Sequence, residues 1–126
     1  MRCAAKNNQQ AIAWLRSSYI ETARQSIELD QKLSRLVFSR DIKYVMLLHL
    51  GGFETVMLPK LLDLLKEKGF RLVTLEEAES DPAYQSNPNV LLKYGGTLLD
   101  QMMVARHLTY PPASPKPLKE LDALCQ

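Results

Sequence analysis

A run of seven residues, 44–50, with the sequence Tyr-Val-Met-Leu-Leu-His-Leu, limits the possible folds more than any other part of the chain. Asp41 precedes it and Gly51-Gly52 follows it. A short, continuously apolar run between turn residues is typical of a strand that is covered on both faces, as in a parallel sheet. A strand with one wet face would alternate apolar and polar residues instead. The run therefore predicts a buried parallel strand with a hydrogen-bonding neighbour on each side.

The residues after this run predict a helix and then a second strand. Pro59 suits the first turn of a helix, where its missing N–H is not needed, and Gly69 suits the position just past the helix end. Residues 71–75 predict a second short strand, and Thr74 and Glu77 have the spacing of a capping box for a brief helix after it. The order strand–helix–strand predicts two parallel strands with a right-handed crossover. Leucines at helical spacing mark the buried stripe of the helix: Leu58, Leu61, Leu62 and Leu65.

Further helices are expected on both sides of this unit. Residues 8–39 contain no Gly or Pro and repeat apolar residues at helical spacing, with Asn8 as the expected N-cap. Two apolar stripes favour either one long helix buried on two faces or a break near Asp30. Thr97 is expected to cap a helix that carries Leu99, Met102 and Met103. Residues 110–117 are proline-rich and should be extended, and residues 118–125 suit a last short helix.

The length of 126 residues fits one domain, with residues 79–126 as an irregular and helical C-terminal extension. The net charge of +2 comes from scattered basic residues, so the chain does not resemble a nucleic-acid binder. Neither a secretory signal nor a transmembrane run is readable, so we expect no membrane partner. Cys3 and Cys125 lack metal-ligand spacing, and whether they form a disulfide is left open.

The predicted sheet lacks strands. Residues 44–50 need neighbours on both sides, yet only residues 71–75 offer a convincing partner, and parallel sheets occur in multi-stranded folds. The chain is therefore expected to be of the α/β class, the closing part of a barrel or doubly wound domain. The remaining strands are expected on another polypeptide segment, upstream of Met1.

His49 is the candidate catalytic residue, because it stands at the carboxyl end of the predicted strand. Active sites of α/β barrels and open parallel sheets gather at that edge. The ordinary pKa of histidine, about 6.5, also suits proton transfer near neutrality. The structural alternative is a histidine that closes a strand by bonding a backbone carbonyl. Glu54 either pairs with His49 or favours the positive end of a helix, and His107 suits a helix C-terminus.

Residues 44–49, the leucine-rich helix and the stretch Lys-Gly-Phe-Arg-Leu-Val-Thr-Leu-Glu-Glu-Ala at residues 68–78 resemble the end of NodB-type polysaccharide deacetylases. The residues Asp-Pro-Ala-Tyr at 81–84, Lys-Tyr-Gly-Gly-Thr at 93–97 and the proline-rich tail are similar to a subgroup of that family. The one catalytic motif present is Leu47-Leu48-His49.

This resemblance implies a distorted (β/α) barrel that removes N- or O-linked acetyl groups from a glycan with a divalent metal, usually zinc. It implies that His49 is the general acid and that Leu47 lines the acetyl pocket. The family's metal and substrate motifs (Thr-Phe-Asp-Asp, His-x-x-x-His and Arg-x-Pro-Tyr) are absent, so this chain offers no metal ligands. The resemblance thus predicts part of a deacetylase that acts with its missing N-terminal half. The alternative is a noncatalytic α/β interaction module or an inactive remnant.

Overall fold

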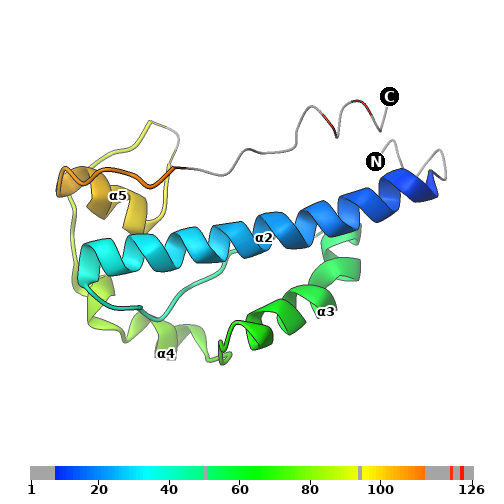
Figure 1. The fold of residues 1–126 in the computed structure, drawn as a ribbon. Coiled ribbons are helices and arrows are strands. Elements are labelled where there is room, and N and C mark those ends of the chain that lie inside the picture. The colour runs from blue at the N-terminus through cyan, green and yellow to red at the C-terminus, as the bar shows by residue number, and fades with distance from the viewer. Residues whose placement is uncertain (1–7, 50, 94, 113–119, 121–122, 124–126) are drawn as a thin grey trace. The chain divides into compact units, whose positions relative to one another are not determined.

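The computed structural model describes residues 8–49, 51–93, 95–112, 120 and 123, and the elements it defines there are helices (Figure 1). In chain order they are α2 (Gln9–Phe38), α3 (Gly52–Glu67), α4 (Leu75–Glu79), the 3-10 helix η1 (Pro82–Gln85) and α5 (Leu98–Ala105). The chain divides into two compact units. The first comprises Met1–Ser26, Leu50–Phe70 and Ser114–Gln126, and the second comprises Ile27–His49 and Arg71–Ala113.

The predicted α/β fold is wrong for the described residues, which form no strand, sheet or barrel. Residues 44–49 and 71–74 are irregular, and the β-type pairing that is present is one isolated bridge between Lys93 and Gly95. The predicted parallel pair and its crossover are therefore wrong as well. The physical reason is that a strand is stable only beside another strand, and these two runs do not pair with each other.

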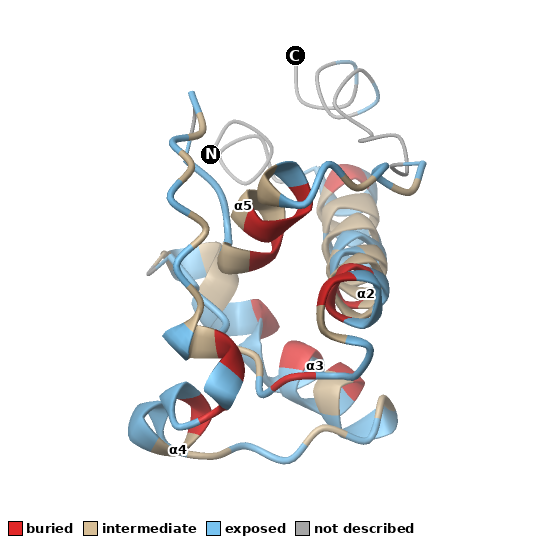
Figure 2. Cartoon of the chain, turned by 90° about the vertical axis from the view of Figure 1, so that its left-hand side faces the viewer, coloured by how far each residue is buried: buried red, intermediate tan, exposed pale blue. Residues whose placement is uncertain are grey.

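The core of the second unit lies between the C-terminal part of α2 and α5 (Figure 2). α5 buries Leu99, Met102 and Met103, which are three and four residues apart and so share one helical face. Each of these side chains is worth about 1.5–3 kcal/mol when removed from water. The buried residues of this core are Leu33, Val37, Ile42, Ala83, Leu99, Met102 and Met103.

In the first unit, α3 buries Met57, Leu61 and Leu64, again at helical spacing. Contacts with the first part of α2 are made near both ends of α3. The rings of Tyr19 and Phe53 meet edge to face with their centroids 5.6 Å apart, and the Arg24 guanidinium binds the Glu67 carboxylate at 3.0 Å.

The predicted helix caps are confirmed. Asn8 Oδ1 accepts from the Ala11 amide at 3.0 Å, and α2 then runs without a break at Asp30. Thr74 caps α4, and Thr97 forms a reciprocal capping box with Asp100 at the start of α5.

Gly69 ends α3 with φ +81°, the left-handed conformation that glycine adopts without steric cost. The Phe70 amide donates to the Leu65 carbonyl and the Gly69 amide to that of Lys66, which is a Schellman motif.

The start of α3 was predicted wrongly. Pro59 lies inside the helix and not in its first turn, because the helix already begins at Gly52. The Gly-Gly pair was interpreted as a turn, yet Gly51 is the N-cap and Gly52 the first helical residue. Proline has no N–H to donate to the carbonyl four residues back, and for this reason the sequence pattern predicted Pro59 in the first turn.

The predicted helix over residues 118–125 lies outside the described residues apart from Glu120 and Ala123, and both cysteines lie outside them entirely. None of the described helices is long and apolar enough to span a membrane.

Candidate functional site

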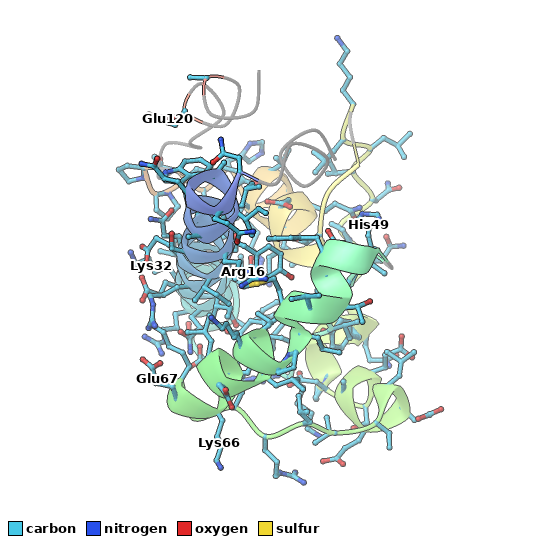
Figure 3. All side chains as sticks on the ribbon, turned by 90° about the vertical axis from the view of Figure 1, so that its right-hand side faces the viewer. Arg16, Lys32, His49, Lys66, Glu67 and Glu120 are labelled. Carbon is cyan, nitrogen blue, oxygen red and sulfur yellow. The ribbon has the colours of Figure 1, made fainter. Side chains whose placement is uncertain are left out.

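His49 and Leu47, the two residues singled out for catalysis, lie on an exposed segment of the second unit. His49 is exposed (Figure 3), and the side chain of Leu47 has 85% of its surface open to solvent. Val45, Met46 and Leu48 are each more than 40% exposed. Residues 45–49 of the apolar run are thus exposed to solvent on both faces.

The beginning of this segment is bonded to α2 through a buried serine. Ser34 is fully buried and donates from its hydroxyl to the Arg40 carbonyl at 2.8 Å. The same hydroxyl accepts from the Ile42 amide at 3.1 Å. The Ser34 hydroxyl is both donor and acceptor, so its burial leaves no hydrogen-bonding group unsatisfied. These two hydrogen bonds connect residues 40–42 to α2.

Asp81, at the N-cap of η1, makes the largest set of bonds to the segment. Its carboxylate binds both Nη atoms of Arg40, with the Nη1–Oδ2 pair 2.9 Å apart. It also accepts from the amides of Lys43 at 3.0 Å and of Ala83 at 2.9 Å. The side chain of Asp81 is only 6% exposed, and the Arg40 hydrogen bonds hold the pKa of this carboxyl well below its ordinary range. Asp81 therefore stays charged and joins two chain segments about forty positions apart in the sequence.

Tyr84, also in η1, adds a second connection. Its hydroxyl donates to the Lys43 carbonyl at 2.7 Å, and the backbone of Val45 lies close enough to the same phenol to affect its pKa. Burial raises the pKa of Tyr84, so the hydroxyl keeps its proton and can donate. The Lys43 ammonium reaches the Glu77 carbonyl at 3.0 Å, which draws α4 to the same place.

Past Val45 this bonding stops. Among the described residues, Met46, Leu47, Leu48 and His49 make no hydrogen bond or ion pair. The segment therefore has two parts: residues 40–45, which we call the anchored root, and residues 46–49, which we call the free tip. The two residues with predicted roles, Leu47 and His49, both lie on the free tip.

The two weaker candidates, Glu54 and His107, stand at helix ends. Glu54 is in the first turn of α3, where a carboxylate interacts favourably with the helix dipole. His107 is exposed and follows α5 with φ +53°. His107 directly follows the C-terminal end of α5, where a positive side chain interacts favourably with the helix dipole.

The described residues do not fit the metal that the resemblance implies. They contain no group of three or more His, Cys, Asp or Glu side chains placed to hold an ion. Asp81 is saturated by Arg40 and by two backbone amides.

Sequence reasoning missed Ser34, Arg40, Asp81 and Tyr84 as the residues that hold the segment. The sequence places Asp81-Pro82 only within the irregular extension expected from residue 79 onward. An aspartate before a proline does indicate an N-cap, and the structure places Asp81 at one. The pairing with Arg40 spans 41 positions and leaves no local pattern.

No family model, no curated protein and no solved structure matches this chain.

Proposed function

We propose that this chain supplies the general-acid part of a metal-dependent glycan deacetylase, with His49 as the proton donor and Leu47 beside the acetyl group. The observation that carries the proposal is the free tip, an exposed apolar segment that ends in an exposed imidazole. Exposed leucines of this kind gain by being covered, and covering them would bring His49 to the covering surface. The resemblance to NodB-type polysaccharide deacetylases supports the assignment of the chemistry.

The role of His49 follows from the bond that such a reaction breaks. Hydrolysis of an acetamide or acetate ester passes through a tetrahedral intermediate whose C–N or C–O bond must cleave. The departing amine or alkoxide takes a proton from the imidazolium, which becomes a neutral imidazole, and acetate is released. Proton donation of this kind accelerates a reaction by roughly a hundred- to ten-thousand-fold.

The metal and its ligands would come from another polypeptide segment, because the described residues hold no suitable cluster. A segment carrying the family's Thr-Phe-Asp-Asp and His-x-x-x-His motifs is the partner that the proposal requires. The substrate class is an acetylated polysaccharide or oligosaccharide.

The test is reconstitution. The purified chain is mixed with a zinc-loaded polypeptide that carries those motifs, and acetate release from an acetylated chitin oligosaccharide is measured. We expect release only from the mixture. His49→Ala should lower turnover about a hundredfold or more with bound zinc unchanged, whereas the exposed His107→Ala should leave turnover unaltered.

Loss of zinc in His49→Ala would mean that His49 is a ligand and that its proposed role is wrong. A mixture that forms a complex yet releases no acetate would favour the second candidate, a noncatalytic interaction module. That candidate is supported by the same exposed run of Val45, Met46, Leu47 and Leu48, which can bind a partner without any chemistry at His49.

A further inference from the structure

We infer that Asp81 and Tyr84 are positioning residues: they fix the direction in which the segment bearing Leu47 and His49 leaves the second unit. The inference rests on the proposed function for the importance of that segment. The bonds that carry it are independent of any activity.

Asp81 acts at the start of the segment. Its carboxylate binds the Arg40 guanidinium through two N–H donors and the Lys43 amide through a third. A fork of two parallel bonds fixes orientation as well as distance, and the added amide bond fixes the chain three residues later. Because the carboxylate is almost fully buried, water cannot easily replace these donors.

Tyr84 acts one step further along. Its hydroxyl donates to the carbonyl of Lys43 at 2.7 Å, and the backbone of Val45 lies close enough to the same phenol to affect its pKa. A residue of a neighbouring parallel strand would bond the Lys43 carbonyl in the same way. The phenol thus takes the place of a strand neighbour at the Lys43 carbonyl.

The result is a segment whose direction is set before anything covers its tip. Fixing a backbone residue costs about 1–2 kcal/mol of conformational entropy. Because the root is already ordered, the binding of a partner by the tip does not have to supply the free energy for ordering the root. His49 lies four positions beyond Val45, so an error in the direction of the root would be magnified at the imidazole.

The experiment measures geometry in the full chain. Cys3 and Cys125 are replaced by serine, and spin labels are attached at Val45→Cys, the exposed last residue of the anchored root, and at Lys32→Cys on the same unit (Figure 3). The distribution of label-to-label distances is recorded with Asp81→Asn, which keeps the size of the side chain, and with Tyr84→Phe, which removes only the hydroxyl. Glu79→Gln, an exposed carboxylate two positions away, is the matched control.

We expect one narrow distance in the parent chain and in the control, and loss of that narrow distance in both test variants. Amide exchange at Lys43 should accelerate about tenfold or more in Asp81→Asn, the effect of losing a bond to a charged acceptor. Amides of α5 should stay protected, which separates local release from unfolding. An unchanged distance distribution in both variants would overturn the inference.

Acetate release by the reconstituted mixture separates this inference from the proposed function. Broadened distances with a lower turnover number and unaltered zinc support a positioning role. Broadened distances with unaltered turnover overturn that role, while the proposed function survives. Absence of release with the parent chain overturns the proposed function, and the distance measurement still decides whether Asp81 and Tyr84 hold the segment.

Discussion

α5 and the free tip are similar in apolar content and opposite in burial. Met103 on α5 is fully buried, whereas Leu47 on the free tip is 85% exposed. Both lie in the same unit. A helix bonds its own backbone and needs cover on one face only. An extended segment needs a neighbour for its backbone and cover for two faces.

Hydrophobicity alone does not decide whether a side chain is buried. α5 meets its needs within this unit, because the face carrying Leu99, Met102 and Met103 packs against Leu33 and Val37 of α2. The free tip lacks both kinds of partner in the described part of the chain. Its exposure is what the proposed function uses, in which another polypeptide segment covers the free tip.

The largest effect is expected inside the core. Met103→Ala should lower the free energy of unfolding by about 2–5 kcal/mol, because it leaves a cavity among fully packed side chains. Val104→Ala, the exposed neighbour on the same helix, should change it by no more than about 0.5 kcal/mol. Urea unfolding followed by circular dichroism measures both, and equal losses would contradict the packing described for α5.

The next effect concerns the anchored root. Asp81→Asn should cost about 1.5–3 kcal/mol at pH 7, the usual contribution of hydrogen bonds to a charged group. Arg40 lowers the pKa of Asp81 in the folded chain. The carboxylate therefore stabilises the fold above its ordinary pKa of about 3.9 and loses that contribution as the pH falls below this value.

Unfolding curves between pH 2 and pH 7 test the sign of this dependence. The stability difference between parent and Asp81→Asn should shrink as the pH falls below about 4. Asp41 and Glu67, whose pKa values are also lowered, are present in both chains and cancel in the difference. A difference that does not vary with pH would mean that the charge of Asp81 contributes nothing.

A smaller effect of opposite sign is expected at Asp30. Burial, and then the nearby charge of Asp100, raise the pKa of Asp30, so ionisation of Asp30 weakens the fold at neutral pH. Asp30→Asn should stabilise the chain at pH 7 by on the order of 0.5 kcal/mol. The gain should vanish below about pH 4, where the carboxyl is protonated in both states. Thermal unfolding of the parent and of Asp30→Asn at the two pH values measures this gain. If the variant is still more stable in acid, the charge of Asp30 is not the cause.

The smallest effect is expected on the free tip. Leu47→Ala should leave the unfolding free energy within about 0.5 kcal/mol of the parent, because the side chain is already in water. Leu33→Ala, the same substitution at a buried position, should cost about 2–5 kcal/mol. A large loss in Leu47→Ala would show that the tip is packed in solution.

Much of the helical architecture could be predicted from the sequence, because its signals are local. Asn8, Thr74 and Thr97 cap the helices that they were expected to cap, and Gly69 ends α3. The strands were predicted wrongly because strand formation depends on a partner that the apolar pattern cannot supply. The start of α3 was predicted too late in the sequence because Pro59 was taken to mark it. Proline is tolerated inside a helix at a cost and does not always mark the helix start.

The candidate site likewise contains residues that a local pattern identifies and residues that only the tertiary structure reveals. Leu47 and His49 were identified from a short motif at the end of an apolar run. The residues that hold this run, Ser34, Asp81 and Tyr84, act through bonds that join distant positions. Such bonds follow from tertiary structure and carry no local signature, so the sequence alone could not reveal them.

Amide hydrogen exchange of Met46, Leu47 and Leu48 in the purified, monomeric chain tests the account most directly. We predict exchange close to that of an unstructured peptide at these three amides, with strong protection in α5, and slowing at the tip once the metal-bearing polypeptide is added. Slow exchange at the three amides in the isolated chain would contradict the account, because the tip would then already have found its neighbours within these 126 residues.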